Sequence, residues 1–358
     1  MDKILLTTGG TGGHIFPALA VAEELRRRMP DARLLFVGSV YGPEARLCAR
    51  AGIEFAGLPV RGFLGRGLRA VGAAARMSVA VGKALSLVRS FRPDAVAGFG
   101  GYAAFAPMLA ARLCGVPAVL HEQNAVAGTS NRVLARLARR VCVSLPGTQG
   151  FPEEKCVLTG NPVRAAIAGV ADMRKDAATR GTKRLLVLGG SQGAHSLNAL
   201  MPGLLARLRD AGVEIRHQCG EKDLEATRAA YVEAGYAPDC VSAFIDDMAE
   251  AYAWADLALC RAGASTVAEL CAAGLPSVLV PFPAAIHDHQ TRNAEVVAAA
   301  GAGRLVQERD FPRTDMAALL LGLFADPAAL ADMGRAARGL ARTDAAAAVA
   351  DALTAVAR

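Results

Sequence analysis

Short apolar runs alternate along the chain with longer segments of mixed polarity. The runs at Lys3–Thr7, Arg33–Gly38, Ala95–Phe99 and Pro117–Leu120 are too short for helices and end at glycine or polar residues, so we predict buried strands there. Ile15–Arg28 and Ala84–Ser90 are amphipathic and predict helices. This alternation indicates a parallel sheet with helices on both faces, the doubly wound α/β fold.

The second half of the chain repeats the order of the first half. The matching segments are 3–14 with 184–195, 94–102 with 256–266, and 115–120 with 274–279. Three matches in one order, offset by about 160 to 180 residues, predict two similar Rossmann-like domains. We place the boundary at Gly160-Asn-Pro162, because such a triplet ends one element and precedes a linker. The predicted domains are 1–162 and 163–340, and the pattern of the final helix at 344–357 does not assign it to either one.

Composition fits this organisation. The chain has 358 residues, too many for one comfortable core, and 53% of them are hydrophobic, which excludes disorder as the main state. The 8 cysteines form no CxxC pair, so we expect neither a zinc site nor a disulfide framework, and a reducing cytoplasm fits. The apolar stretch 103–120 is interrupted by Arg112 and Pro117 and does not predict a membrane span.

The positive charge is concentrated between Phe55 and Pro93, where no acidic residue occurs. The basic residues there are Arg61, Arg66, Arg69, Arg76, Lys83, Arg89 and Arg92. Apolar residues lie between them, a composition that suits an anionic membrane surface. The alternative is a solvated basic face whose apolar residues belong to the core. Nucleic acid is not expected as a partner, because aromatic residues are scarce and no binding motif is present.

The stretch from Leu259 to Gln290 carries the strongest chemical pattern. A strand ends in the small-residue turn 261–266, and a helix containing Glu269 follows. Backbone N–H groups at such a helix start bind phosphate oxygens. Glu269 is placed to accept hydrogen bonds from a ribose, and Gln290 to offer an amide to a sugar, so the pattern indicates a nucleotide sugar. The alternative is an ordinary βαβ unit whose glycines only form turns.

The opening glycine turn, Gly9–Gly13, has no phosphate-binding lysine after it, so it is not a P-loop. His14 follows directly and is expected to start the helix. No Asp-x-Asp pair occurs, so the usual carboxylate ligands of a diphosphate-bound metal are absent and we expect no metal. We also expect no other cofactor. Ligands of doubly wound sheets bind outside the carboxyl ends of the strands. Two such domains are therefore expected to face a central cleft, with 8–14 and 98–102 opposite 189–193 and 261–266.

These motifs together resemble the MurG family, which transfers N-acetylglucosamine from UDP-N-acetylglucosamine to lipid I, a membrane-anchored undecaprenyl-pyrophosphoryl-muramyl-pentapeptide. The resemblance covers essentially the whole chain. It rests on the segments 8–17, 100–102, 121–124, 160–164, 189–193, 244–248 and 259–290. It implies the two-domain GT-B fold, with the donor bound by the C-terminal half. It also implies that the final helix, 341–358, crosses back to the N-terminal acceptor domain.

Carried over by position, the resemblance implies a set of residues that bind UDP-N-acetylglucosamine. They are Thr11, Gly12, Gly13, Asn124, Arg164, Ser191, Ile245, Ala264, Ser265, Thr266, Val267, Ala268, Glu269 and Gln290. Ile245 is expected to contact the uracil through its backbone. Gly100, Gly101 and Tyr102 are expected on the acceptor side. Ala284 stands where many relatives carry a polar residue, which puts a polar role at that position in doubt.

An inverting transfer needs a base to accept the proton of the attacking C4 hydroxyl. Histidine, which ordinarily titrates near pH 6.5, suits this role, so His14 is our first choice and Glu122 our second. We expect the enzyme on the cytoplasmic face of the inner membrane, facing it with Arg66, Arg69, Arg76 and Lys83. Two alternatives remain. A UDP-sugar epimerase of the same superfamily gives no reason for the basic surface, and a non-catalytic membrane-associated binding module does not need His14 and Glu269 together.

Overall fold

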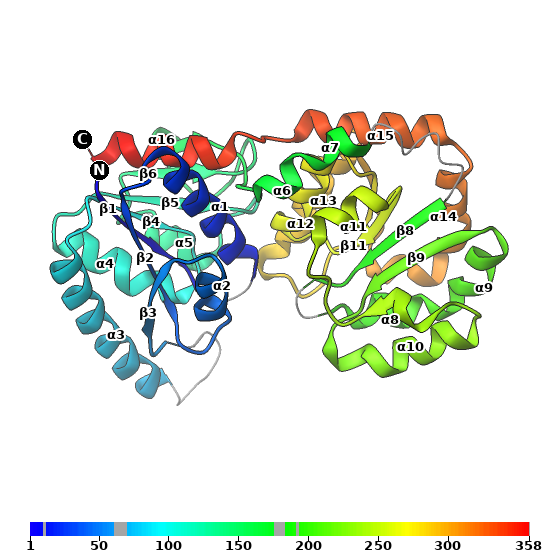
Figure 1. The fold of residues 1–358 in the computed structure, drawn as a ribbon, viewed down its shortest axis with the longest axis horizontal. Coiled ribbons are helices and arrows are strands. Elements are labelled where there is room, and N and C mark those ends of the chain that lie inside the picture. The colour runs from blue at the N-terminus through cyan, green and yellow to red at the C-terminus, as the bar shows by residue number, and fades with distance from the viewer. Residues whose placement is uncertain (10–11, 61–69, 175–182, 191–192, 358) are drawn as a thin grey trace. The chain divides into compact units, whose positions relative to one another are not determined.

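The computed structural model describes residues 1–9, 12–60, 70–174, 183–190 and 193–357. The chain divides into two compact units. Unit 1 comprises Met1–Arg164 and Arg342–Arg358, and unit 2 comprises Ala165–Ala341. The boundary that we predicted after residue 162 lies two residues before this division. The final helix belongs to unit 1 (Figure 1).

Unit 1 is built around a seven-stranded parallel sheet of order β3-β2-β1-β4-β5-β6-β7. Its elements are β1 (Lys3–Thr7), α1 (Gly12–Arg28), β2 (Arg33–Ser39), α2 (Glu44–Arg50), β3 (Glu54–Leu58), α3 (Ala70–Phe91), β4 (Ala95–Gly98), the 3₁₀ helix η2 (Tyr102–Ala104), α4 (Phe105–Leu113), β5 (Ala118–Glu122), α5 (Thr129–Leu134), β6 (Arg140–Val143), the 3₁₀ helix η3 (Glu153–Lys155), β7 (Cys156–Leu158) and α16 (Ala345–Ala357). The order reverses between β1 and β4, which is the switch point where such sheets bind ligands.

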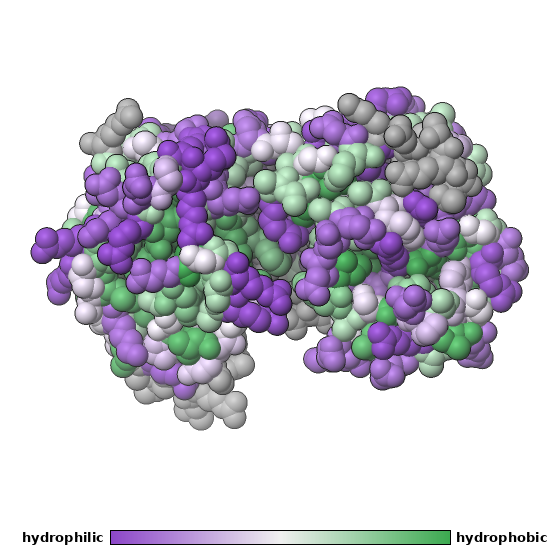
Figure 2. Space-filling model, in the orientation of Figure 1, coloured by the Kyte–Doolittle hydropathy of each residue, from purple (hydrophilic) through white to green (hydrophobic). Residues whose placement is uncertain are grey.

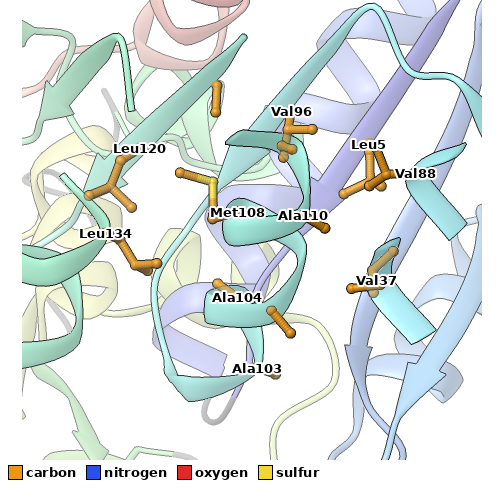
Figure 3. Close-up of a cluster of buried hydrophobic side chains, with 14 of the residues drawn as sticks. Leu5, Val37, Val88, Val96, Ala103, Ala104, Met108, Ala110, Leu120 and Leu134 are labelled. Atoms are coloured by element: carbon orange, nitrogen blue, oxygen red, sulfur yellow. The ribbon is translucent and has the colours of Figure 1, made fainter. Parts of the chain in front are cut away.

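The strands of unit 1 are apolar because both faces of the sheet are covered. Successive side chains point to opposite faces, so Leu5 joins one core cluster while Ile4 and Leu6 join the other. The first cluster lies between the sheet and helices α3 and α4, and Figure 3 shows Met108 of α4 among Val96, Leu120 and other residues of this cluster. The second cluster is covered by α1 and α16. The C-terminal helix is therefore part of the hydrophobic core of unit 1.

Unit 2 repeats this plan around a six-stranded parallel sheet of order β10-β9-β8-β11-β12-β13. Its elements are α6 (Ala165–Ala168), α7 (Val170–Met173), β8 (Lys183–Leu188), α8 (His195–Leu200), α9 (Pro202–Asp210), β9 (Val213–Gln218), η5 (Glu221–Asp223), α10 (Leu224–Glu233), η6 (Pro238–Cys240), β10 (Val241–Ser242), α11 (Met248–Trp254), β11 (Leu257–Cys260), α12 (Ala264–Ala273), β12 (Ser277–Leu279), η7 (Ile286–Asp288), α13 (His289–Ala299), β13 (Gly303–Leu305), η8 (Glu308–Arg313), α14 (Met316–Phe324) and α15 (Pro327–Leu340). The switch point lies between β8 and β11. The predicted doubly wound fold of both halves is confirmed.

Three predicted boundaries were wrong. The helix predicted at 84–90 is α3, which starts at Ala70, because the alanine-rich segment before residue 84 favours helix and the helix packs on α4. The strand predicted to end at residue 120 continues as β5 to Glu122, since His121 and Glu122 pair with Cys142 and Val143 of β6. Helix α1 starts at Gly12, two residues before His14, which we had expected to start it.

No single helix among the described residues is long and apolar enough to cross a membrane. Taken together, α14 and the helical stretch Pro327–Ala357 meet the length and composition test, but they are bent by 92° at the break between them.

Candidate active site

The two glycine turns at the switch point of unit 1 are in direct backbone contact. The Gly9 N–H donates to the Gly100 carbonyl at 3.2 Å. A Cβ on Gly101 would lie 1.7 Å from the Gly9 oxygen, and φ of Gly101 is +78°, so glycine is required there. A Cβ on Gly9 would lie 2.3 Å from the Ala103 Cβ. The predicted acceptor-side residues Gly100, Gly101 and Tyr102 therefore lie against the turn that leads into α1.

His14 is the third residue of α1 and lies at the positive end of the helix dipole. Its side chain is half-buried, and its Nδ1 atom is buried. It is close enough to His121 that its charge contributes to lowering the pKa of His121. His14 is therefore held at the carboxyl edge of the sheet, as the sequence pattern predicts for this position.

His121 is a fixed neutral imidazole. It is 1% exposed, and burial lowers its pKa to about 4, although the hydrogen bond to Gly160 opposes this shift. Its Nε2–H donates to the Gly160 carbonyl at 3.0 Å, and the Gln123 amide donates to Nδ1 at 3.1 Å. With both nitrogens engaged, His121 holds the segment that leads to Arg164 rather than serving as a base.

Glu122 is buried and accepts four hydrogen bonds. The backbone and side-chain N–H groups of Asn124 donate to Oε1 at 3.0 and 3.1 Å. The Gly128 N–H and the Asn131 amide donate to Oε2 at 3.1 and 2.8 Å. A carboxylate offers about four acceptor positions, so these donors saturate it. The geometry favours Glu122 as a residue that orients Asn124 and the start of α5 over its predicted role as second-choice base.

Two of the predicted donor-binding residues, Gly12 and Arg164, lie against the ring of Phe16. The Arg164 guanidinium lies over the Phe16 ring, 4.8 Å from its centroid. A Cβ on Gly12 would lie 2.9 Å from the same ring, so the glycine allows the first turn of α1 to pack against Phe16. Arg164 is far from Gly12 and Gly13 in sequence, but all three residues lie around the start of α1.

In unit 2, helix α12 follows β11 at the switch point and begins at Ala264. The first intrahelical bond runs from the Val267 N–H to the Gly263 carbonyl at 2.9 Å, so the N–H groups of residues 264–266 precede the helical ladder. Asn293 of α13 donates to the Ala262 carbonyl at 3.1 Å and fixes the turn. Among the predicted contacts, Val267 is only 6% exposed, which directs its side chain into the core. Ala268, the next predicted position, is half-buried.

Glu269 lies in the second turn of α12 and is 9% exposed. The Tyr252 hydroxyl of α11 donates to its Oε2 at 2.9 Å. Tyr252 itself is 1% exposed. A buried carboxylate must be hydrogen-bonded, and Tyr252 supplies one such bond from a neighbouring helix.

Gln290 is fixed by the loop that precedes it. Its Oε1 accepts from the Phe282 N–H at 3.0 Å, which leaves the orientation of its NH₂ group defined. His287 and Asp288 in this loop have φ of +54° and +52°, a strained conformation for residues other than glycine. Arg261 anchors the start of the loop by donating to the carbonyls of Val280 and Pro281 at 3.2 and 3.1 Å.

Arg261 also connects this loop to two other segments of unit 2. It donates to the Ser196 hydroxyl at 2.8 Å and forms an ion pair with Glu308 at 2.7 Å. Ser196 in turn donates to Glu308 at 2.8 Å. The turn before α12, the start of α8 and the loop before Gln290 are therefore held in one arrangement.

Ile245, the predicted uracil contact, is held by Gln218. The Gln218 amide donates to the Gly190 carbonyl at 3.0 Å, and its Oε1 accepts from the Ile245 N–H at 3.4 Å. The sequence analysis missed Gln218, Tyr252 and Asn131. Each is a polar residue buried in the fold, and the only sequence signal for Gln218 is its place at the carboxyl end of β9, next to Cys-Gly.

Several predicted residues lie outside the described part of the chain: Thr11, Ser191, Arg66 and Arg69. Arg76 and Lys83 are described, and both are exposed on α3. In the described ranges, no group of three or more His, Cys, Asp and Glu side chains is arranged to hold a metal ion.

A second buried histidine, His217, lies in unit 2. Its Nε2 and Nδ1 atoms are hydrogen-bonded to Asn198 Oδ1 at 3.1 Å and to the Tyr231 hydroxyl at 3.0 Å. Burial lowers its pKa to about 3. Each unit therefore contains a histidine that is neutral in the folded protein.

Because both histidines are neutral in the folded protein, we expect both units to be less stable in mild acid. Their folded pKa values lie below the ordinary value of about 6.5, so the unfolded chain binds the protons first. The free energy of unfolding should be highest above about pH 6.5 and fall by up to about 1.4 kcal/mol per pH unit for each histidine, down to about pH 4. Urea unfolding between about pH 7.5 and 5 measures this slope, and His217→Asn should reduce it in unit 2. A flat profile would contradict the prediction.

Known proteins resemble this chain over its whole length. Residues 4–143 match the glycosyltransferase family 28 N-terminal domain, and residues 184–350 match the glycosyltransferase family 28 C-terminal domain. A protein of Nitratidesulfovibrio vulgaris is 56% identical, with 99% of this chain and 97% of the relative covered. A protein of Solidesulfovibrio magneticus is 51% identical, with 100% and 98% covered. Both are named UDP-N-acetylglucosamine--N-acetylmuramyl-(pentapeptide) pyrophosphoryl-undecaprenol N-acetylglucosamine transferase.

Two solved structures also match this chain over nearly its whole length. The crystal structure of Acinetobacter baumannii MurG is 36% identical, with a TM-score of 0.75 and with 99% of this chain and 100% of that chain covered. The UDP-GlcNAc 2-epimerase of Neisseria meningitidis, solved with UDP-GlcNAc, has a TM-score of 0.70 over 99% and 100% of the two chains, but only 14% identity. The second likeness shows a common fold alone.

Proposed function

The chain belongs to the MurG family of glycosyltransferases, and from this premise we infer that it transfers N-acetylglucosamine from UDP-N-acetylglucosamine to lipid I, forming lipid II for peptidoglycan synthesis. The observation that carries this inference is identity of 46 to 56% to transferases of that name over nearly the whole chain. The epimerase alternative rests on the fold alone, because the epimerase is only 14% identical. A non-catalytic binding module is not favoured by any of these relatives.

We propose that unit 2 binds the donor at its switch point. The N–H groups of residues 264–266 and the dipole of α12 would stabilise the diphosphate, both bound and as it leaves. Glu269 would accept hydrogen bonds from the ribose hydroxyls. Ile245, held by Gln218, would contact the uracil, and the NH₂ group of Gln290 would donate to the sugar. Ser191 would add a phosphate contact, as the family resemblance implies.

We propose that unit 1 supplies the acceptor site and the base. In an inverting transfer the C4 hydroxyl of the muramyl sugar forms a bond to C1 of the donor sugar while the bond from C1 to the diphosphate breaks. The hydroxyl proton passes to a base. We propose His14 for this role, because hydrogen bonds already engage both nitrogens of His121 and both carboxylate oxygens of Glu122. Glu122 would position Asn124 through the hydrogen bonds at its Oε1. His121, kept neutral by burial, would position the segment carrying Arg164.

A two-substrate assay tests this function. UDP release should require both UDP-N-acetylglucosamine and a lipid I analogue, and neither alone should support it. Release of UDP from the donor alone, with the sugar changed at C2, would instead indicate the epimerase. Binding of UDP-N-acetylglucosamine with no release under any condition would indicate the binding module.

We propose that the enzyme works as a peripheral protein on the cytoplasmic face of the inner membrane, and that through cell wall biogenesis it serves cell shape and division. Lipid I presents its diphosphate and sugars at the membrane surface. Helix α3 carries Arg76 and Lys83 on its exposed side, with Val79, 54% exposed, between them. On the face shown in Figure 2, hydrophilic and hydrophobic residues are interspersed.

Membrane binding by this basic segment predicts a dependence on lipid charge and salt. Each basic residue near an anionic leaflet contributes about 1 kcal/mol, and the attraction decays over about 8 Å at physiological salt. Binding to vesicles should therefore require anionic lipid and weaken as salt rises. Replacing Arg66, Arg69, Arg76 and Lys83 with Gln should weaken it by at least about tenfold. Activity on a water-soluble, short-chain acceptor should be kept.

A matched variant distinguishes an effect of this surface on vesicle binding from an effect of net charge alone. Replacing four exposed arginines of unit 2 with Gln changes the charge by the same amount; they are Arg292, Arg304, Arg309 and Arg313. This variant should bind anionic vesicles like the parent protein. If the variant with Arg66, Arg69, Arg76 and Lys83 replaced also binds like the parent, the basic segment is only a solvated face and the protein docks elsewhere.

A further inference from the structure

Helix α11 lies between two of the predicted donor contacts in unit 2. It begins at Met248, three residues after Ile245, and its N-cap Asp247 accepts from the Glu250 N–H at 2.9 Å. The cap fixes where the helix starts, and therefore fixes the segment that carries Ile245. Tyr252, in the second turn of the same helix, reaches Glu269 of α12.

Tyr252 is itself held at both its backbone and its side chain. The Arg174 guanidinium donates to the Tyr252 carbonyl at 2.6 Å and also to the Ala255 carbonyl, which secures the carboxyl end of α11. The hydroxyl donates to Glu269 Oε2 at 2.9 Å. Both partners of this bond are almost completely buried, so water does not compete strongly for either.

We propose that Tyr252 is a positioning residue for nucleotide binding, which aims the Glu269 carboxylate at the ribose hydroxyls. It also couples that contact to the uracil contact at Ile245 through the short, capped helix α11. A carboxylate without this bond has more rotamer freedom and must be ordered when the ribose binds, which lowers affinity. The inference rests on the proposed function, because it takes Glu269 to be the ribose contact.

The test compares two ligands that differ only in the ribose. Calorimetry measures the Kd of UDP and of 2′,3′-dideoxy-UDP for the parent protein, Tyr252→Phe and Glu269→Ala. Tyr252→Phe removes the hydroxyl and keeps the ring, and it should weaken UDP about tenfold while changing dideoxy-UDP less than about twofold. The KM for UDP-N-acetylglucosamine should rise by a similar factor with kcat nearly unchanged. In Tyr252→Phe/Glu269→Ala, UDP affinity should equal that of Glu269→Ala alone.

Tyr236→Phe is the matched control. Its hydroxyl donates at 3.1 Å to the Val213 carbonyl, at the amino end of β9, which is the edge of the sheet opposite the switch-point turns. It should leave both affinities unchanged. Equal weakening of UDP and dideoxy-UDP by Tyr252→Phe would overturn the inference and leave Tyr252 a merely structural residue. No weakening of either ligand would overturn it as well. If Glu269→Ala also fails to distinguish the two ligands, the proposed ribose contact itself is wrong.

Discussion

Replacement of His14 by alanine is expected to lower kcat about 10²- to 10⁴-fold, the usual contribution of a positioned general base. His14 lies in the first turn of α1, at the switch point of unit 1, whereas the proposed donor contacts of the diphosphate and ribose lie in unit 2. The Kd for UDP should therefore stay within a few-fold of the parent value. Single-turnover kinetics and UDP titration measure the two quantities separately.

Glu122→Gln is the informative comparison for this variant. The substitution keeps the size of the side chain but replaces one carboxylate oxygen with an NH₂ donor, whereas the four hydrogen-bond partners of Glu122 described above are all N–H groups. We expect it to lower stability and to disturb Asn124. Near-normal turnover of His14→Ala, together with a folded but inactive Glu122→Gln, would move the role of base to Glu122.

Glu269→Ala is expected to raise the KM for UDP-N-acetylglucosamine roughly 10- to 100-fold, because hydrogen bonds to a charged group contribute about 1.5–3 kcal/mol. The ribose does not change during the reaction, so kcat should stay within a few-fold. Steady-state kinetics with the donor varied at saturating acceptor measures this change. An unchanged KM in a folded variant would mean that the ribose is bound elsewhere.

Local sequence patterns were enough to predict the doubly wound fold. The apolar strands β1, β2, β4 and β11 are flanked by turn residues, and the glycine turns after β1 and β8 recur at the same place in both halves. The predicted ends of strands and helices were wrong where tertiary packing overrides local sequence preference. His121 and Glu122 are polar, yet they continue β5 because pairing with β6 and internal hydrogen bonds satisfy them.

The position of Glu269 was predictable, because local sequence alone places it one turn inside a helix that follows a glycine turn. The residues that orient such groups were not predictable. Tyr252 and Glu269 are separated by 17 residues and belong to different helices, and Gln218 reaches Ile245 across 27 residues. Only the folded arrangement of α11, α12 and β9 brings these side chains together.

The linkage formed in the product tests the proposed reaction most directly. After incubation with UDP-N-acetylglucosamine and a lipid I analogue, nuclear magnetic resonance of the isolated lipid should show one N-acetylglucosamine joined by a β-linkage to C4 of the muramyl sugar. One UDP should be released for each linkage formed. An unmodified lipid accompanied by free or epimerised sugar, or a product with an α-linkage, would contradict inverting transfer by this enzyme.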